Sequence, residues 1–292
     1  MKNSIYQILF IIAVLLPVSV QSQTLQNQYD ILYNDLVNFN QYGYRSQMGG
    51  FSTKNRQSSD LMISPNWIPF DKYAFYILGE GFFKLYDAKN DRYLYTRNGQ
   101  FYLSKNHIVI NKDDYQLMPA IDVSAGWGSS TKQSPAPNVI LQLNDYLLFN
   151  FEYEDQKPGK SLTFKMQLYK PAKDSTIVQN GIYYSFSKSE PVEGIDAYHL
   201  IQGYLERSNV NTLNTIFGMY GLLLEMKRQS IPFPCIDEKL FILKNLIYGV
   251  NEVPYFFNIN IDLVAHEVPP EMKRKDQEII KKALPFLSRD YQ

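Results

Sequence analysis

Apolar residues near the N-terminus recur at alternating steps of four and three. The members of this series are Leu25, Tyr29, Leu32, Leu36 and Phe39. That spacing places them on one narrow seam of a helix, with the period of a coiled coil. Gly43 follows at a point where a helix needs a left-handed C-terminal residue, which glycine adopts at little cost. The pattern therefore predicts an amphipathic helix over residues 23–42, ending at Gly43.

A second apolar stripe at helical spacing begins after Asn211, a residue that caps helix N-termini well. Pro232 and Pro234 should end this helix early, so it is expected over residues 211–228. Neither helix can bury its apolar side alone. We expect the two to pair with one another or with a neighbouring subunit. The stripe consists of Leu213, Ile216, Phe217, Tyr220, Leu223, Leu224 and Met226.

Between Lys72 and about Ser189 the chain changes to short, alternating apolar runs separated by turn residues. Such runs, with no helical period between them, favour an antiparallel β domain of the sandwich or barrel type. Asn98 and Gly99 both tolerate positive φ, so they predict a hairpin between strands at 93–97 and 101–103. Further strands are expected at 73–78, 82–86, 108–110, 139–143, 146–153, 162–169 and 181–186.

The two ends of the chain carry different signals. Residues 1–22 combine Lys2, an apolar core and a cleavage-like end, which predicts a signal peptide; a retained membrane anchor is the alternative. Residues 46–71 are expected to form a linker. In the extension 231–292, helices are expected at 237–248 and 270–284, with a strand at 255–264. The fold class is thus α+β, with a β-rich domain (72–190) inserted between an N-terminal helix (23–45) and a return segment with its helix (191–230).

Composition narrows the possible functions. The formal net charge is zero, from 29 basic and 29 acidic residues, so no basic excess indicates nucleic acid or an anionic membrane as partner. His107, His199 and His266 are scattered without metal-ligand spacing. Nucleophile-elbow, phosphate-loop and dinucleotide motifs are absent from the sequence. We expect no cofactor, no metal, no small-molecule substrate and no catalytic residue. The single cysteine, Cys235, cannot form an internal disulfide.

Residues 34–45, 77–121 and 202–211 carry three blocks of motifs that, in this order, resemble the flagellar rod and hook proteins, the bacterial axial family, and most of all its distal-rod members. Residues 34–45 align without gaps with the family signature Asn-Asn-Leu-Ala-Asn-Val-Asn-Thr-x-Gly-Phe-Lys, with Asp35 at its second asparagine. Residues 77–83 read Ile-Leu-Gly-Glu-Gly-Phe-Phe, and residues 95–101 read Tyr-Thr-Arg-Asn-Gly-Gln-Phe, both similar to family segments. Residues 115–121 and the Gln-Gly-Tyr-Leu-Glu-Arg-Ser-Asn-Val-Asn run at 202–211 complete the likeness.

The resemblance implies roles for particular residues. The asparagines and Gly43 would shape the corner between helix and linker and its contacts with other subunits. The residues around Gly79 and Gly81 would shape a turn and the core of the β domain. The run at 202–211 would return the chain to the axis. A purely intramolecular role as cap, turn or core is the alternative for each. The residues so implied are Asn34, Leu36, Asn38, Asn40, Gly43, Tyr44, Gly79, Gly81, Phe82, Phe83, Arg97, Gly99, Gln202, Gly203, Leu205, Ser208, Asn209, Val210 and Asn211.

Two departures from the family separate the functional hypotheses. Family members leave through the flagellar exporter without a cleaved signal peptide, and the extension 231–292 replaces their closing helix. The first hypothesis is a non-enzymatic structural component of the flagellar rod-hook axis and basal body, exported to the periplasm, whose partners are other axial subunits or copies of itself. The second is a periplasmic scaffold or binding protein with this fold outside the rod. The third is an envelope hydrolase.

Overall fold

The computed structural model describes residues 22–46, 65–67, 71–127, 136–142, 145–152, 159–194, 197–249 and 270–290. Backbone contacts divide the chain into two units. The helical unit holds residues up to Phe39, Ser46–Phe51 and Val210 onward, and the β unit holds Asn40–Arg45 and Ser52–Asn209. Nearly all of the expected signal peptide, most of the expected linker and the strand expected at 255–264 lie outside the described residues.

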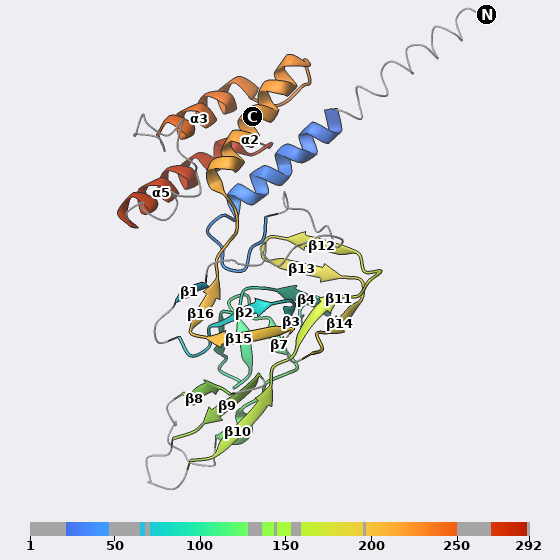
Figure 1. Ribbon diagram of the computed structural model, residues 1–292, viewed down its shortest axis with the longest axis vertical. Coiled ribbons are helices and arrows are strands. Elements are labelled where there is room, and N and C mark those ends of the chain that lie inside the picture. Colours follow the sequence, from blue (N-terminus) through green and yellow to red (C-terminus); the bar gives the residue numbers. More distant parts are fainter. Residues whose placement is uncertain are drawn as a thin grey trace, which may run out of the picture. The chain divides into compact units, whose positions relative to one another are not determined.

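The helical unit is built from a first helix over residues 22–37 and three later ones, α2 (Thr212–Arg228), α3 (Ile236–Gly249) and α5 (Pro270–Leu287) (Figure 1). Local sequence explains their starts. The Asn211 side chain accepts a hydrogen bond from the Asn214 N–H, which confirms it as the N-cap of α2. Asp237 and Glu238 lie in the first turn of α3, where the helix dipole favours acids. The helices expected in the extension are therefore present.

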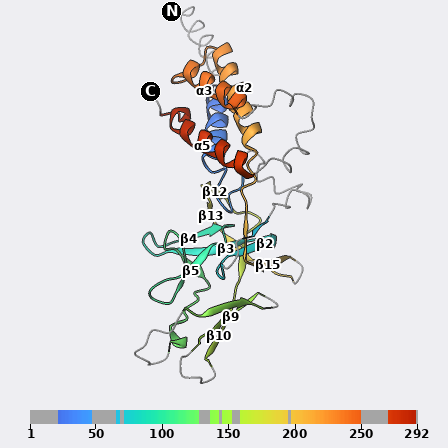
Figure 2. The same cartoon turned by 90° about the vertical axis from the view of Figure 1, so that its left-hand side faces the viewer.

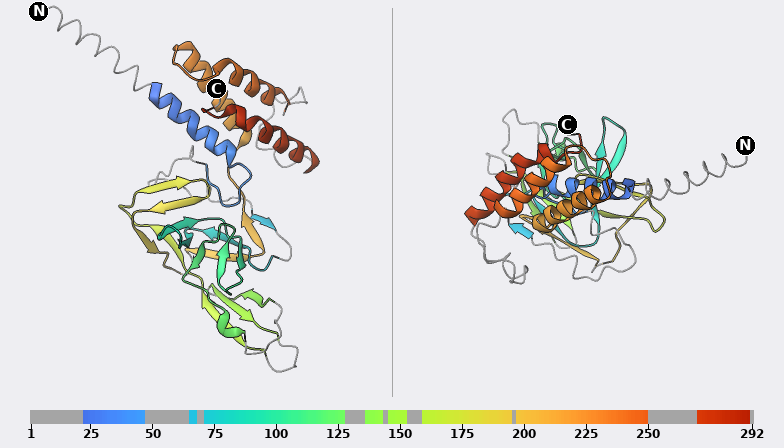
Figure 3. Two further views of the ribbon diagram at one scale, coloured as in Figure 1. Left: turned by 180° about the vertical axis from the view of Figure 1, so that it is seen from behind. Right: turned by 90° about the horizontal axis from the view of Figure 1, so that it is seen from above.

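One buried cluster joins all four helices. Tyr29, Leu32 and Leu36 of the N-terminal seam are almost fully buried. An ideal Cβ on Gly218 of α2 would lie 3.0 Å from Leu32 Cδ1, so the two helices approach closely there. The chain's own extension supplies much of the same core through the side chains of α3 and α5. Figure 3 shows the ribbons of these helices in orange and red next to the blue first helix. The other fully buried members include Ile216, Met219, Leu223 and Met226 of α2, Leu243 of α3 and Leu287 of α5.

The end of α5 is hydrogen-bonded to the first helix. The Tyr29 hydroxyl donates to the Leu287 carbonyl at 2.8 Å, and its ring meets Phe233 edge-on with centroids 4.8 Å apart. Arg289 pairs with Asp30 at 3.1 Å. The carbonyls at a helix C-terminus lack partners within the helix, so the Tyr29 hydroxyl satisfies one of them at the end of α5.

The first helix ends earlier than predicted, at residue 37 instead of 42. The Asn38 side chain donates to the Asn34 carbonyl at 2.8 Å and contacts the Asn34 side chain at 3.2 Å. Asparagine side chains compete with the helical backbone in this way, so the run of asparagines stops the helix. Gly43 does have a positive φ of +73°. It lies six residues beyond the helix end, so its role as the helix C-terminal glycine was predicted wrongly.

The β unit is antiparallel throughout its described strand pairs, which confirms a β-rich region between helices. Its largest sheet has the order β12-β13-β4-β3-β7-β6-β5, with β11 paired to both β3 and β14. Smaller sheets pair β10-β9-β8, β15-β2 and β1-β16. Figure 2 shows β10 beside β9 and β15 beside β2. The bounds are β1 Pro65–Trp67, β2 Phe75–Gly79, β3 Phe82–Asp87, β4 Arg92–Thr96, β5 Phe101–Leu103, β6 Val109–Asn111, β7 Gln116–Met118, β8 Asn138–Leu141, β9 Tyr146–Asn150, β10 Ser161–Lys165, β11 Leu168–Pro171, β12 Ile177–Asn180, β13 Tyr183–Phe186, β14 Ser189–Pro191, β15 Tyr198–Gln202 and β16 Tyr204–Glu206.

The hairpin predicted at Asn98-Gly99 is absent from the described pairings. β4 pairs with β3 and β13, whereas β5 pairs with β6. The Phe75 N–H donates to the Gly99 carbonyl at 3.0 Å, and an ideal Cβ on Gly99 would lie 1.9 Å from the Phe75 carbonyl oxygen. Gly99 thus allows a crossing against β2 instead of a reversal of the chain. The strand expected at 162–169 is likewise two strands, β10 and β11, in different sheets.

Candidate functional site

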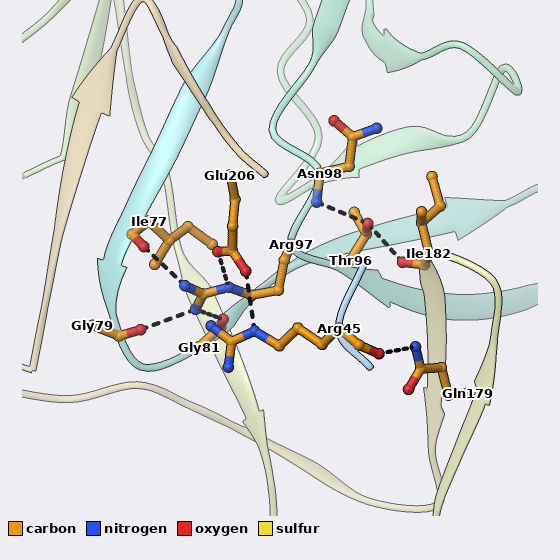
Figure 4. A network of polar contacts seen from close by, with 10 residues as sticks. All are labelled: Arg45, Ile77, Gly79, Gly81, Thr96, Arg97, Asn98, Gln179, Ile182 and Glu206. Atoms are coloured by element: carbon orange, nitrogen blue, oxygen red, sulfur yellow. Dashed lines mark hydrogen bonds and ion pairs between the residues drawn. The ribbon is translucent and has the colours of Figure 1, made fainter. Parts of the chain in front are cut away.

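Three of the family-like segments meet at one buried carboxylate, that of Glu206 at the end of β16. Arg45 Nε donates to Glu206 Oε1 at 3.0 Å, and Arg97 Nε donates to Glu206 Oε2 at 2.7 Å (Figure 4). The exposed fractions of the three side chains are 8%, 2% and 0% for Arg45, Arg97 and Glu206. We call these three residues the arginine–glutamate cluster. All three belong to the β unit.

Arg97 also binds the turn between β2 and β3. Its Nη1 donates to the carbonyls of Gly79 and Gly81 at 3.0 and 2.7 Å, and its Nη2 donates to the Ile77 carbonyl at 2.8 Å. Gly79 and Gly81 have φ values of +110° and +103°, which L side chains rarely adopt. This backbone path turns the carbonyls toward one guanidinium. The glycines of the predicted motif therefore form the acceptor site for its arginine.

Gly43 fits against the same cluster from the N-terminal segment. Its N–H donates to the Glu206 carbonyl at 2.8 Å. An ideal Cβ at Gly43 would lie 2.1 Å from the Asn98 nitrogen and 2.6 Å from the Arg97 carbonyl carbon, so no side chain fits there. The neighbouring Tyr44 is fully buried, and the Arg45 carbonyl accepts from Gln179 Nε2 at 2.9 Å. These contacts hold the Gly43–Arg45 backbone in the β unit.

The electrostatics of the cluster indicate a structural clamp. Two guanidiniums share one carboxylate, which leaves a net buried charge of +1. Burial lowers the pKa of the Arg97 guanidinium, and Glu206 opposes that shift; arginine still stays charged in proteins. Both carboxylate oxygens accept from arginine, and Glu206 is fully buried. Its carboxylate is therefore not accessible to a substrate as an acid or base.

The remaining residues of the β2–β3 motif are packed in two cores. Phe83 is fully buried in the main core of the β unit. Phe82 forms a separate aromatic cluster with Tyr95 and Tyr184, and its ring centroid lies 6.0 Å from the Arg97 guanidinium carbon. Gly99 contacts the Phe75 backbone as described above.

In the return segment, Gln202 joins its own strand β15 to β8 and to Lys72, which precedes β2. Its amide donates to the carbonyls of Lys72 and Val139 at 2.7 and 3.0 Å and accepts from the Leu141 N–H at 3.0 Å. Gly203 has φ +80° between β15 and β16, and Leu205 is fully buried. Ser208, Asn209 and Val210 lie between β16 and α2, with Asn209 exposed.

Residues of the N-terminal segment are divided between the two units. Leu36 and Asn38 are buried in the helical unit, and Asn40 is exposed in the β unit. Asn34 and Asn38 were predicted to form hydrogen bonds with a neighbouring helix. In the structure, the Asn38 side chain instead donates to Asn34 in the last turn of the preceding helix. The intersubunit role of these asparagines stays a prediction.

Arg45 and Glu206 were missed as site residues, although both lie within the family-like segments. The sequence offered only a weak signal, namely that each charged residue directly follows an aromatic or aliphatic residue, Tyr44 or Leu205, within its motif. Their opposite signs would have suggested a pair, but 161 positions separate them along the chain.

The described part of the chain holds neither a group of metal ligands nor a membrane-spanning helix. Its His, Cys, Asp and Glu residues include no group of three or more placed to hold a metal ion. None of its helices is both long and apolar enough to span a membrane.

Comparison with known proteins agrees with the motifs. No curated protein matches the sequence. A family model does match part of the chain. Residues 76–134, which include Gly79, Gly81 and Arg97, match the model of the flagellar hook protein FlgE/F/G D1 domain, so this part of the chain is similar to the flagellar rod and hook proteins.

Proposed function

We propose that this protein is a non-enzymatic structural component of the flagellar rod-hook axis, exported to the periplasm through residues 1–22. The D1 match supports an axial structural role. The proposal rests on one observation above all: Gly43–Arg45, Gly79–Gly81, Arg97 and Glu206 converge on a single buried cluster. The partners of the protein would be other axial subunits or copies of itself.

The position of the cluster along the chain supports this role. The described chain passes from the first helix into the β unit just before Gly43, and leaves the β unit for α2 just after Glu206. Arg45 and Glu206 tie these two crossing points together at 3.0 Å. A subunit that carries mechanical load needs its inserted domain anchored at both chain crossings. A buried ion pair with further hydrogen bonds provides that anchor because breaking it leaves a buried charge unpaired.

Fractionation of basal bodies tests the proposal. A tagged full-length chain would be followed through purification of hook–basal bodies and then through high-salt and detergent washes. An axial component remains in the washed rods and hooks. Loss of the tagged chain at the wash step, with a known rod subunit retained, would contradict the axial role. Intact-mass analysis of the envelope-purified protein tests the export proposal separately, because a cleaved signal peptide places the mature N-terminus near Gln23.

A second candidate, a periplasmic scaffold outside the rod, is favoured by a different observation. The extension covers the N-terminal seam inside the same chain, through Tyr29, Leu287 and Phe233. A seam covered in this way is not free to pack against another subunit. Pull-downs from the envelope with the full chain and with a chain ending at residue 230 would separate the candidates. Axial partners captured only by the shorter chain would favour an axial subunit whose seam must be uncovered.

For the hydrolase alternative, no observation in the described ranges favours catalysis. The one cluster of ionisable side chains described above is buried and internally paired.

A further inference from the structure

Helix α2 presents an apolar side that its own unit does not cover. Its inner side, Ile216, Met219, Leu223 and Met226, is fully buried in the helical core. On another side of the helix, Phe217 and Leu224 are 41% and 45% exposed. Large apolar residues on both sides are unusual for a helix at the surface of a monomer, where the outer side is normally polar.

The exposed residues follow the heptad spacing of a coiled-coil seam. Asn214, Phe217, Gly221, Leu224 and Arg228 are separated by steps of three, four, three and four, and all five are exposed. We call these five residues the outer stripe. The buried residues 216, 219, 223 and 226 follow the same rhythm. α2 therefore carries two seams, and the second has the pattern that receives another helix.

Gly221 lies at the centre of the outer stripe. No atom lies within 4 Å of an ideal Cβ at this position, whereas a Cβ at Gly218 would meet Leu32 at 3.0 Å. Gly218 is thus accounted for by packing within the chain. Gly221 is an unfavourable residue in a helix interior and has no such reason among the described residues. A glycine between two large apolar residues allows another helix backbone to approach closely.

The outer stripe is nearly symmetric about Gly221. Phe217 and Leu224 lie four residues before it and three after it, and Asn214 and Arg228 lie seven residues to either side. An antiparallel copy centred on Gly221 would place Phe217 near the copy's Leu224 and Asn214 beside the copy's Arg228. This is the self-complementarity that a two-fold interface requires.

The two ends of α2 differ, and this difference favours the antiparallel direction. The last turn holds Lys227 and Arg228, which pair with Asp237 and Glu225, whereas the first turn holds no charged residue. A parallel pair would bring the two charged ends, and the like poles of the two helix dipoles, together. The antiparallel pair opposes the dipoles and places the Asn214 amide beside the Glu225–Arg228 pair of the copy.

We propose that the outer stripe of α2 binds the same stripe of a second copy of this chain, antiparallel and centred on Gly221. The association is weak, because a single stripe of this length buries far less surface than a stable interface. The inference goes beyond the proposed function and does not depend on it. Failure of basal-body retention would leave the solution dimer unaffected, and failure of dimerisation would leave the axial role unaffected.

Cysteine cross-linking tests the geometry. In the full chain with Cys235→Ser, the variants Gly221→Cys, Phe217→Cys and Leu224→Cys would each be oxidised mildly and run on non-reducing gels. The antiparallel pair predicts strong cross-linking of the Gly221→Cys chain with itself. It also predicts a cross-linked heterodimer when Phe217→Cys and Leu224→Cys chains are mixed, with little product from either alone. Strong self-linking of Phe217→Cys and Leu224→Cys, without the mixed product, would overturn the antiparallel arrangement.

Sedimentation velocity without added cysteines tests the association itself. The mature chain should show a monomer–dimer equilibrium over ~1 μM to ~1 mM, the range in which weak interfaces associate. Phe217→Asp should weaken the dimer at least ~10-fold, about 1.4 kcal/mol. Phe241→Asp, on α3 and 65% exposed, is the matched control and should leave it unchanged. A wild-type chain that is monomeric throughout, or equal effects of the two variants, would refute the proposal. Circular dichroism verifies that both variants are folded.

Discussion

Replacing Glu206 by glutamine should destabilise the β unit strongly. The glutamine side chain has nearly the same size as glutamate, so the cavity effect is small and the change is one of charge. Two guanidiniums, 2.7 and 3.0 Å from the carboxylate, would lose their shared anion while remaining 2% and 8% exposed. The new amide oxygen can accept from one of them, but the amide nitrogen would oppose the other as a second donor.

The magnitude follows from burial. Removing one partner of a buried ion pair typically lowers the free energy of unfolding by about 3–5 kcal/mol. Whole domains are stable by only about 5–15 kcal/mol, so Glu206→Gln should remove a large part of the stability of the β unit. The matched control is Glu190→Gln, whose partner Lys170 lies 3.4 Å away with both side chains 40–50% exposed. An exposed pair of this kind contributes at most about 1 kcal/mol.

Urea denaturation followed by tryptophan fluorescence measures this effect in the correct unit. The protein has two tryptophans, Trp67 and Trp127, and both belong to the β unit. Far-UV circular dichroism follows the helical unit in the same samples. A Glu206→Gln change within about 1 kcal/mol of the Glu190→Gln change would refute the clamp.

A second variant tests the charge balance. Arg45→Met leaves Glu206 paired with Arg97 and brings the net buried charge from +1 to zero, so it should destabilise less than Glu206→Gln. Combined with Glu206→Gln, it should recover part of the lost stability because it removes one of two unpaired cations. Additive effects of the two changes would show that Arg45 and Glu206 do not interact.

Three further outcomes can be checked with the same protein. Gly43→Ala should lower the free energy of unfolding by at least about 2 kcal/mol, because the new methyl group would lie 2.1 Å from the Asn98 nitrogen. Gly194→Ala is the control, because Gly194 also has a positive φ but only the Ala197 Cβ lies within 4 Å, so this change should cost less. Equal urea midpoints for the two variants would contradict the prediction. Asn211→Ala should destabilise α2 by about 1 kcal/mol, measured by thermal melts followed by circular dichroism. Asn214→Ala, at an exposed position, is the control and should have little effect. A larger loss of stability from Asn214→Ala than from Asn211→Ala would count against the cap. Hydrogen bonds from Arg228 and Gln229 lower the pKa of the Glu225 carboxyl to about 2 from its ordinary value of 4.5. Any stabilisation of the fold by this carboxylate is therefore complete above pH 4.5 and is lost as the pH falls through about 2. Arg228→Gln should raise that pKa in a carboxyl NMR titration, and an unchanged value would show that Arg228 is not the cause.

Much of the secondary structure could be predicted from local sequence patterns. The cap at Asn211, the helices of the extension and the alternation of β3 and β13 depend on neighbours within a few positions, and the structure has each of them. The family segments were also visible, because backbone requirements such as the positive φ of Gly79 and Gly81 restrict the residue type at single positions.

Contacts between distant segments decided what the local pattern could not. Asn98-Gly99 has the composition of a hairpin, yet its backbone crosses β2 because β4 finds better partners in β3 and β13. The first helix stops at residue 37 because Asn38 bonds backward to Asn34, although the apolar seam continues to Phe39. The Glu206 carboxylate has partners 109 and 161 positions away. The sequence by itself determined where the described helices begin and that Gly79 and Gly81 must be glycine. Only the tertiary structure decided which charges share one buried site, because desolvation makes pairing obligatory only once folding has brought those residues together.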